Sequence, residues 1–428
     1  MVETFNIGVA GLGTVGTATI KLIEDNINEI SEKSGKKIII KAVSAKDNSK
    51  DRSINLKRYY WEKDASNLAK REDIDAVVEL IGGSDGIAYD LIKNAIKNNK
   101  HVITANKAFV SAHGYEIINE IKNRKVGFYY EASVVAAIPI INSIKYGLIS
   151  NNVIKIEAIL NGTANYILSD MTMNDSSFNN SLLKAQELGY AEADPSFDVN
   201  GTDSAHKLSI LGMLSFGIKP DISKIYIEGI SNISIEDIKY ANRLGYIIKL
   251  FCLADRKNNI LDFRVHPALV SKEEIISKVN GALNAIFLKG NYSSKVTFIG
   301  EGAGADPTAS SVVSDIINAA INHNDVSNLN IKFKKCSYKS IFDRYGAYYI
   351  RIKVKDLKGV LANITSIFND FNISLDSVIQ DSSKNNTFRY IVALSHMVKE
   401  IDMINAIKTI SKLKTNIGKP QFIRVEKI

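Results

Sequence analysis

The sequence predicts an α/β protein that begins with a doubly wound parallel sheet, continues with an α+β domain and ends with a ferredoxin-like βαββαβ module. Three observations predict this class. Short apolar strands alternate with helical segments in the first part of the chain, and a glycine-rich turn joins the first strand to the first helix. The last part of the chain then follows the βαββαβ order.

The first domain, residues 1–135, is expected to form a Rossmann-type sheet. Its helices show apolar residues three and four positions apart, and its strands are rich in β-branched residues or are followed by glycine. We expect helices after the first, third and fourth strands. The expected strands are 5–10, 37–43, 76–81, 101–104 and 126–130.

The second and third domains differ from the first in their patterns. Residues 136–335 form an α+β domain with strands at 154–160, 260–266, 282–288 and 295–300 and helices at 181–188 and 203–216. The polar, lysine-rich stretch 322–340 is expected to be a linker. Residues 347–428 supply the βαββαβ module, with strands 348–354, 374–380, 389–395 and 421–425 and helices 360–371 and 401–413.

Composition excludes several classes of protein. Of 428 residues, 45% are hydrophobic and 23% charged, which is typical of a globular chain. The net charge of +8 comes from dispersed lysines, so a solvated surface is favoured over nucleic-acid binding. No apolar run approaches the ~18 residues of a membrane helix, and no basic-then-apolar leader is expected. Two cysteines, Cys252 and Cys336, suit a reducing cytoplasm.

The turn after the first strand has the sequence GLGTVG, which comprises Gly11, Leu12, Gly13, Thr14, Val15 and Gly16. Gly11 permits the tight turn, Gly13 lets the backbone approach a pyrophosphate, and Gly16 lets the helix pack on the strand. The helix amino terminus offers N–H groups and a positive dipole end to phosphates. The turn therefore predicts a dinucleotide cofactor.

The end of the second strand bears on the choice of cofactor. It carries no carboxylate that would accept a ribose 2′-hydroxyl. Lys46 and Arg52 would instead meet a 2′-phosphate, which favours NADP over NAD. The alternative, that both are simply exposed basic residues, stays open.

Two further turns follow strands at the edge where open parallel sheets bind ligands. Gly82 and Gly83 follow the third strand. Thr104 ends the fourth strand, and Lys107 follows it. Lys107 would hold a carboxylate, phosphate or aldehyde oxygen near a nicotinamide. The alternatives are a surface lysine and an Asn106 that only caps the helix.

Residues 189–207, GYAEADPSFDVNGTDSAHK, contain four acidic residues and a single lysine, Lys207. The acidic residues are Glu192, Asp194, Asp198 and Asp203. Asp203 and Lys207 are four residues apart and share a helix face. The carboxylates would bind an ammonium group, and Lys207 would donate a proton to a carbonyl oxygen as hydride arrives. An ordinary surface ion pair is the alternative, and His206 is expected to be a bystander.

Two segments of small residues complete the pattern. In EASVVAAIP, residues 131–139, converging backbone carbonyls and the Glu131 carboxylate would hold a monovalent cation. Close packing of a helix on the sheet is equally compatible. The glycine loop 300–304 opens a helix, and the segment near 300–320 is expected to return to the cofactor, with a plain turn as the alternative.

Together these residues resemble the homoserine dehydrogenase family over nearly the whole chain. The motifs that carry the resemblance are GLGTVG, IGG, ITANKA, EASVVAAIP, LNGTANYIL, GYAEADP, DVNGTDSAHK and GEGAGADPTAS. The resemblance implies an NAD(P)H-dependent interconversion of L-aspartate 4-semialdehyde and L-homoserine, within threonine, methionine and isoleucine biosynthesis. No metal is needed to polarise the aldehyde.

The resemblance also implies a role for each site residue. Lys207 would be the acid/base, Lys107 a second catalytic cation, and Asp203 a carboxylate beside the reacting oxygen. Substrate contacts would be Glu192, Asp203, Asp198 and Thr163. The cofactor would meet residues 11–16, Gly82, Gly83, Thr104, Lys107 and Gly302. A sodium ion would bind the Glu131 carboxylate and the carbonyls of Val134, Ala136 and Ile138.

The sequence departs from the family pattern at two places. The family's glycine-rich run after Glu131 is Val135-Ala136-Ala137, and Asp306 precedes Pro307 where a less charged residue is expected. We have no account of Asp306.

The carboxyl-terminal module resembles an ACT domain in YYIRIKVKDLKGVLANI, LDSVIQ and FRYIVALSH. This implies an L-threonine effector at 356–361 between paired modules, although Lys358 replaces the usual proline. A dimerisation module without an effector is the alternative. A homodimer or homotetramer is expected.

Two rival functions remain beside the enzyme. One is a non-catalytic amino-acid sensor that acts through a partner, and the other is a related reductase of another amino-acid aldehyde. The intact glycine turn, both lysines and all the acidic residues favour the enzyme.

Overall fold

The computed structural model describes residues 3–324, 331–382 and 388–427. The chain forms two compact units, each assembled from segments that are distant in the sequence. The first unit comprises Met1–Ile156, Asp203–Ile222 and Leu283–Cys336, and the second comprises Glu157–Thr202, Ser223–Ala282 and Ser337–Ile428.

The first unit contains a six-stranded parallel sheet with the order β3-β2-β1-β4-β5-β6. From β1 the chain moves outward to one side and then to the other, so the strand order reverses between β1 and β4, where doubly wound sheets bind ligands. This sheet confirms the predicted fold class. Its strands are β1 (Glu3–Ala10), β2 (Lys36–Ser44), β3 (Tyr60–Trp61), β4 (Ala76–Glu79), β5 (His101–Thr104) and β6 (Phe128–Tyr129).

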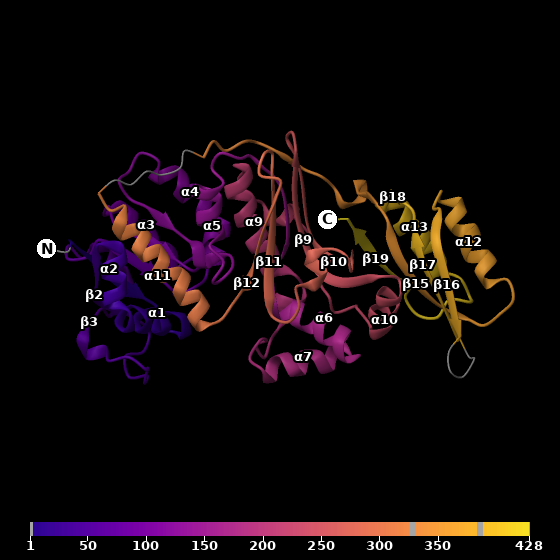
Figure 1. Ribbon diagram of the computed structural model, residues 1–428, viewed down its shortest axis with the longest axis horizontal. Coiled ribbons are helices and arrows are strands. Elements are labelled where there is room, and N and C mark those ends of the chain that lie inside the picture. The colour runs from indigo at the N-terminus through magenta and orange to yellow at the C-terminus, as the bar shows by residue number, and fades with distance from the viewer. Residues whose placement is uncertain (1–2, 325–330, 383–387, 428) are drawn as a thin grey trace. The chain divides into compact units, whose positions relative to one another are not determined.

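Helices cover this sheet, and one of them comes from far along the chain. Apolar residues of β1, of α1 (Thr14–Asp25) and of α11 (Ala305–Ile321) share one buried core. In Figure 1 the orange α11 lies against the indigo α1. The other helices of this unit are α2 (Ile27–Ser34), α3 (Ile87–Lys97), α4 (Lys107–Ile121), α5 (Ile140–Asn142) and most of α9 (Thr202–Phe216).

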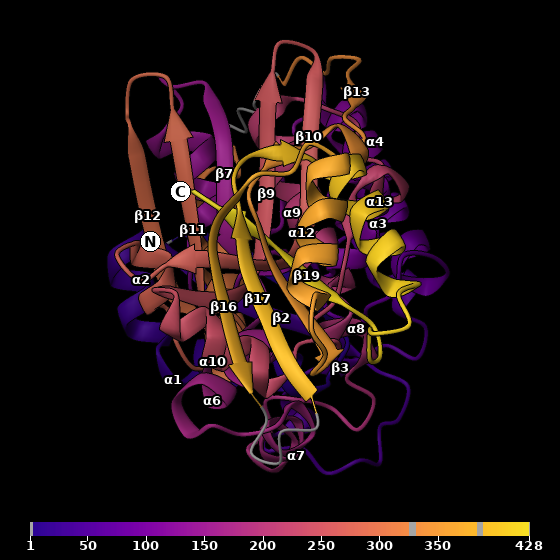
Figure 2. The ribbon, with the colours of Figure 1, turned by 90° about the vertical axis from the view of Figure 1, so that its right-hand side faces the viewer.

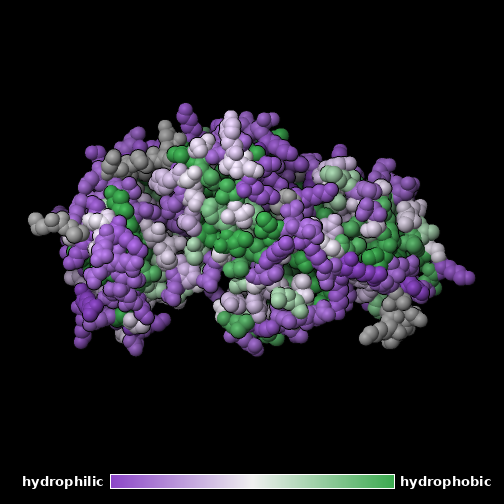
Figure 3. Space-filling view, in the orientation of Figure 1, coloured by the Kyte–Doolittle hydropathy of each residue, from purple (hydrophilic) through white to green (hydrophobic). Residues whose placement is uncertain are grey.

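An antiparallel hairpin, β11 (Leu283–Gly290) with β12 (Lys295–Glu301), also belongs to the first unit. Exposed and half-buried residues alternate along β12, as in a strand with one open face. Leu283 and Ile299 are 36% and 49% exposed. Figure 3 shows hydrophobic surface gathered where Figure 1 places these two strands.

The second unit is built on a sheet with the order β9-β10-β19-β15-β17-β16, in which only the β10–β19 pair is parallel. β10 (Ile260–Ser271) carries β19 (Gln421–Glu426) along its edge, so the carboxyl-terminal module extends a sheet begun by β9 (Tyr246–Lys257). The remaining helices are α6 (Gly162–Asn174), α7 (Phe178–Glu187), α8 (Ser196–Val199) and α10 (Ile235–Arg243). The short strands are β8 (Tyr226–Ile227), β13 (Ser337–Tyr338), β14 (Tyr345–Gly346) and β18 (Val398–Lys399), and β7 (Val153–Ile159) has residues in both units.

The carboxyl-terminal module has the predicted βαββαβ order. It runs β15 (Tyr348–Lys355), α12 (Val360–Asp370), β16 (Leu375–Ser382), β17 (Phe388–Ser395), α13 (Glu400–Ser411) and β19. The strand order β19-β15-β17-β16 is that of a ferredoxin-like sheet. Figure 2 shows α12 and α13 side by side, and both contribute to one core with β15 and β17.

Several elements differ from those the patterns predict. Helices α6 and α10 and the strand β9 have no predicted counterpart, and α4 begins eight residues before the predicted stretch at 115. Part of the expected linker, residues 325–330, lies outside the described residues. Beyond that gap, β13 pairs with β10. Among the described residues, no helix has the length and apolar character that crossing a membrane requires.

Candidate active site

The glycine turn between β1 and α1 is closed by packing at both ends. Gly11 has a φ of +96°, and a Cβ atom there would lie 2.4 Å from the carbonyl oxygen of Leu80. A Cβ atom at Gly16 would lie 2.0 Å from the carbonyl oxygen of Gly11. At Gly13 nothing lies within 4 Å of such an atom. Packing therefore requires the first and last glycines, and the middle one leaves space before the helix.

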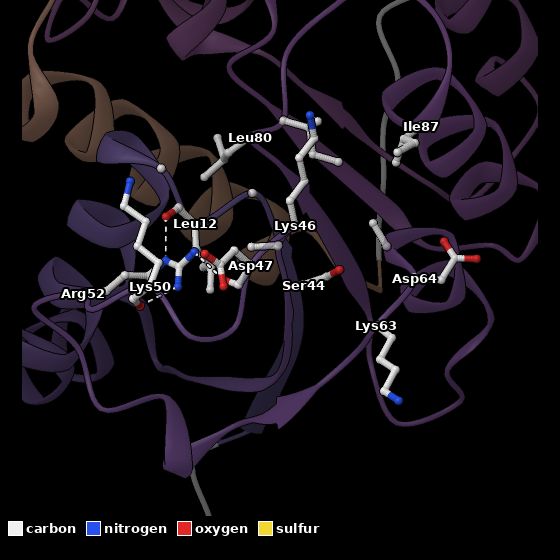
Figure 4. A pocket seen from close by; sticks show the side chains of 15 residues that line it. Leu12, Ser44, Lys46, Asp47, Lys50, Arg52, Lys63, Asp64, Leu80 and Ile87 are labelled. Carbon is white, nitrogen blue, oxygen red and sulfur yellow. Dashed lines mark hydrogen bonds between the residues drawn. The ribbon is translucent and has the colours of Figure 1, made fainter.

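A cavity of about 460 Å³ opens beside this turn (Figure 4). Gly11, Leu12 and Gly13 line it, together with residues that follow β2 and β4. Its charged lining residues are Lys46, Lys50, Arg52, Lys63, Asp47 and Asp64. Because the cations outnumber the carboxylates, the cavity favours an anionic ligand.

Arg52 ties the loop after β2 to the glycine turn. Its Nε donates to the carbonyl of Leu12 at 2.9 Å, and its two Nη atoms donate to the carbonyls of Lys50 and Asp47 at 2.9 and 2.8 Å (Figure 4). In the same loop, Ser49 donates its hydroxyl and its N–H to Asp47 and lowers the pKa of that carboxyl. Arg52 thus shapes the cavity wall through three backbone carbonyls.

A second cavity, of about 320 Å³, lies within the same unit. Both predicted lysines line it. Lys107 is the first residue of α4, and Lys207 lies on α9. The glycine turns after β4 and after β12 supply other parts of the wall, as Gly82, Gly83 and Gly302. These five residues come from four separate predicted motifs, which the structure brings together.

Asp203 joins the two lysines of this cavity. Its Oδ2 lies 3.0 Å from the Nζ of Lys207, one helical turn further along α9, and its Oδ1 pairs with the Nζ of Lys107. Asp203 is 2% exposed and Lys207 is 7% exposed. A carboxylate that is buried and paired at both oxygens holds the two ammonium groups at one wall of the cavity.

The helices that carry these lysines are also joined behind the cavity. The hydroxyls of Ser111 on α4 and Ser209 on α9 lie 2.8 Å apart, and Ser209 donates to the carbonyl of His206. His206 is half-buried, and burial lowers the pKa of its imidazole. It does not line the cavity.

Glu79, which no sequence motif singles out, fixes the two turns beside this cavity. It ends β4, is 0% exposed, and accepts hydrogen bonds from both turns. Thr104, expected at the cofactor, is likewise fully buried and lines neither cavity. The signal available in the sequence was a glutamate that directly follows an apolar strand, at the end of AVVE.

The predicted substrate residues of the second unit lie around the start of α6. Thr163, in the first turn of α6, donates to the carbonyl of Tyr190 at 2.5 Å. Asn161, which caps α6, donates to Asp198 at 2.7 Å. Glu192 is exposed, and its carbonyl accepts a bond from Gln186. Nearby, the hydroxyl and the N–H of Ser196 lower the pKa of Asp194.

The segment that begins at Glu131 is buried and turns sharply. The Glu131 carboxylate accepts the N–H groups of Ile141 and Asn142 at 2.7 and 2.8 Å, at the start of α5. Burial raises the pKa of Glu131. Burial, with the charge of Glu131, also raises the pKa of Asp315 on α11 to about 8, and Asp315 accepts the N–H of Glu131.

The carbonyls expected to bind a cation follow this carboxylate. Ala136 and Ile138 each accept the N–H two residues further on, at 2.7 Å, and Ala137 has a φ of +56°. The N–H of Ala136 donates to the carbonyl of Gly302, which joins the segment to the second glycine loop. The donor set is a buried carboxylate with backbone carbonyls, the hard oxygen ligands that suit a sodium ion.

The expected effector turn of the carboxyl-terminal module is exposed. Gly359, the residue before α12, has a φ of +81°, and Leu357 is 58% exposed. Asp356 pairs with Arg389 of β17 at 2.6 Å, which lowers the pKa of that carboxyl. The turn is therefore held on one side by an ion pair at the surface.

Three family models match the chain in sequence order. The model described as the homoserine dehydrogenase NAD binding domain matches residues 11–131, the homoserine dehydrogenase model matches 139–317, and the ACT domain model matches 348–415. A homoserine dehydrogenase of Helicobacter pylori is 40% identical over 431 residues, with 100% of each chain covered. One of Neisseria gonorrhoeae is 38% identical, with 99% of each chain covered. The crystal structure of a homoserine dehydrogenase from Thiobacillus denitrificans is 37% identical and superposes with a TM-score of 0.91, over 99% of this chain and 98% of that chain.

Proposed function

The chain belongs to the homoserine dehydrogenase family, and from this premise we propose how its residues carry out the reaction. It is an oxidoreductase with a nicotinamide-binding domain, and it interconverts L-aspartate 4-semialdehyde and L-homoserine. The rival sensor function is not favoured, because relatives that match over the full length are dehydrogenases. We keep residues 1–135, 136–335 and 347–428 as the proposed cofactor, catalytic and ACT domains.

One observation carries the proposed mechanism: Asp203 holds two lysine amines at the cavity that the glycine turns line. When bound, the nicotinamide cofactor supplies the hydride for aldehyde reduction or takes it from the alcohol. The aldehyde oxygen gains negative charge as hydride arrives, so a fixed ammonium group beside it stabilises the transition state. The carboxylate orients both amines before any substrate binds.

We assign the proton transfer to Lys207. Its ammonium donates a proton to the substrate oxygen during reduction, and its neutral amine takes that proton back during oxidation. Lys207 is the more buried of the two lysines, with 9% of its side chain exposed against 38% for Lys107. Lys107 adds the second positive charge at the reacting oxygen.

We propose that the cofactor lies along the turns at the carboxyl edge of the parallel sheet. Residues 11–16 hold the pyrophosphate, and Gly82, Gly83 and Gly302 line the cavity that receives the nicotinamide. Lys46 and the other cations of the first cavity favour NADP over NAD, because a 2′-phosphate adds negative charge there. Thr104 does not line this surface, and we propose that it contributes through the hydrogen bonds of its hydroxyl to Glu79 and Asn106.

Three further assignments rest on the family resemblance. Glu192, Asp198 and Thr163 are proposed substrate contacts. Glu131, with the carbonyls of Val134, Ala136 and Ile138, is the proposed sodium site. A sodium ion there would order the segment whose Ala136 bonds to the second glycine loop. Cys252 is buried and Cys336 is half-buried, and from the low cysteine content we propose a reducing cytoplasm as the location.

We also propose that the protein is a homodimer or homotetramer whose ACT module binds L-threonine. The exposed Leu283 and Ile299 of the β11–β12 hairpin support self-association, since exposed apolar patches commonly mark interfaces. The exposed turn before α12 supports an effector site. Inhibition by L-threonine in steady-state assays would test the effector, and sedimentation would test the assembly.

The acid/base assignment is tested with Lys207→Ala. The variant should bind NADPH as the wild type does but turn over aspartate semialdehyde about 10²-fold more slowly, the typical contribution of a general acid. Exposed Lys97→Ala on α3 is the matched control and should keep full activity. Full activity in Lys207→Ala would remove that residue from its role, and a wild type inactive on this aldehyde would overturn the proposed reaction.

A further inference from the structure

Glu79 connects the turns that follow two adjacent strands. Its Oε1 accepts the N–H groups of Ile81 and Gly82 at 2.8 and 3.1 Å. Its Oε2 accepts the hydroxyl of Thr104, the last residue of β5, at 2.6 Å. Burying a carboxylate costs free energy unless donors replace the lost water, and here two backbone N–H groups and one hydroxyl do so.

The chain of bonds continues from Thr104 and returns to the first turn. The Thr104 hydroxyl accepts the N–H of Asn106 at 2.9 Å. The Asn106 side chain donates to the carbonyl of Gly83 at 2.6 Å, and its oxygen accepts the N–H of Phe109 and so caps α4. Glu79, Thr104 and Asn106 thus form a closed ring of bonds across both turns.

This ring sets the position of the first residue of α4, which is Lys107. The cap at Asn106 fixes where the helix begins, and the Lys107 amine extends from that point to Asp203. We propose that Glu79 is a positioning residue for this dehydrogenase, which acts through Thr104 and Asn106 to hold the Lys107 amine at the cavity. The inference rests on the proposed role of Lys107 at the reacting oxygen.

The donors and acceptors in the ring predict what Glu79→Gln would change. The Gln oxygen replaces Oε1 for the N–H groups of Ile81 and Gly82, so the turn after β4 keeps its bonds. The Gln amide nitrogen then faces the Thr104 hydroxyl, which already accepts the N–H of Asn106. The buried hydroxyl proton loses its acceptor, so the disturbance falls on the turn that carries Lys107.

The expected kinetic result is therefore a split between turnover and cofactor binding. Glu79→Gln should lower kcat about 10²-fold, the effect of an ångström-scale displacement of a catalytic group. The NADPH dissociation constant, from fluorescence titration, should change less than about threefold. Thr104→Val breaks the same bond and also removes the acceptor of the Asn106 N–H, so it should lower kcat at least as much.

A double variant distinguishes a shared bond from two independent lesions. If Glu79 acts through Thr104, the combined change should lower kcat no further than Thr104→Val does alone. Independent effects would multiply to about 10⁴-fold and would overturn the proposal. Unchanged kcat in Glu79→Gln would overturn it as well.

A readout without turnover separates this inference from the proposed function. In the cofactor-free protein, competitive lysine labelling followed by mass spectrometry should show Lys107 reacting faster in Glu79→Gln than in the wild type. The matched control is Glu400→Gln, an equally buried carboxylate in the ACT module, which should lose thermal stability with no change at Lys107. Equal labelling of Lys107 in all three proteins would contradict the inference, even if the wild type proved inactive on aspartate semialdehyde.

Discussion

At the residue scale, Lys46 is the side chain most able to decide between the two cofactors. The Arg52 guanidinium is already bound to three backbone carbonyls, whereas Lys46 lines the same cavity from the loop after β2. Lys46→Gln should lower kcat/KM for NADPH about 10-fold or more, the cost of one hydrogen bond to a charged group. The value for NADH should stay near that of the wild type, and equal losses for both cofactors would refute the assignment.

Lys249 on β9 makes an unusual pH dependence of stability predictable. Lys249 is 1% exposed, its amine lies within hydrogen-bond distance of Asn165, the carbonyl of Val279 and Asn280, and burial lowers its pKa from 10.5 to about 7. Between pH 7 and pH 10.5, Lys249 is therefore protonated in the unfolded chain but not in the folded protein. The free energy of unfolding should therefore rise with pH by about 1.4 kcal/mol per unit from this group.

Urea unfolding of the wild type and Lys249→Met between about pH 7.5 and 9.5 measures this contribution. As pH rises, the unfolding free energy of the wild type should increase relative to that of the variant, by up to about 1.4 kcal/mol per pH unit. Lys257→Met, at the exposed end of the same strand, should show a constant difference from the wild type. A constant difference for Lys249→Met as well would show that the buried amine keeps its ordinary pKa.

The residues that sequence could identify are those whose partners lie nearby in the chain. Asp203 and Lys207 are four residues apart, so helical spacing predicts their contact, and the structure shows it. The pairing of Asp203 with Lys107 spans 96 residues and depends on how α4 and α9 pack. Glu79 has no motif at all, because its partners are backbone groups and one hydroxyl on a neighbouring strand.

At the element scale, the first turn of α10 is held by β15 of the ACT module. Arg351 donates to both oxygens of Asp237, at 2.7 and 3.0 Å, and Asp237 also closes the capping box with Ser234. Asp237 is 0% exposed. Arg351→Met would leave this carboxylate buried without its cation and should cost about 3 kcal/mol of unfolding free energy.

Chemical denaturation would measure that loss. The matched control is Arg389→Met, which removes the surface partner of Asp356 on the neighbouring strand β17 and should cause no measurable change. If both variants unfolded at the same urea concentration, the contact between α10 and β15 would contribute little to stability.

Elements followed their patterns where one face of a strand or helix is exposed. In the ACT module, half-buried and exposed residues alternate along residues 375–380 of β16, and the predicted βαββαβ order is confirmed. In β9, residues 248–254 are all buried, so no alternation marks the strand. Helix α6 is buried over most of its length and lacks the one-sided apolar pattern that identifies a helix.

At the scale of the whole molecule, the ACT module shares a sheet with the strands before it. Residues Ala268–Val270 of β10 pair in parallel with Arg424–Glu426 of β19. Arg424 is 2% exposed and bonds to Glu228, Tyr226 and Glu400. A chain ending at residue 418 should leave Ala268–Val270 of β10 unpaired and should deprive Glu228 and the buried Glu400 of the Arg424 guanidinium.

Such a chain should unfold at a temperature several degrees lower and aggregate on heating, as calorimetry and light scattering would show. The matched control is Arg424→Lys in the full chain, which keeps the strand and the charge. Its melting temperature should lie between those of the wild type and the shortened chain. A shortened chain with the wild-type melting temperature would mean that β19 is dispensable to the sheet.

The core shared by β1, α1 and α11 has a consequence for how the protein is made. The nucleotide-binding sheet emerges early from the ribosome, yet Val312, Val313 and Ile316 of its core are translated far later. Until then the nascent domain exposes the apolar surface of α1 that α11 covers. Such long-range closure slows folding and invites chaperone binding, so synthesis rate between residues 131 and 305 becomes a determinant of yield.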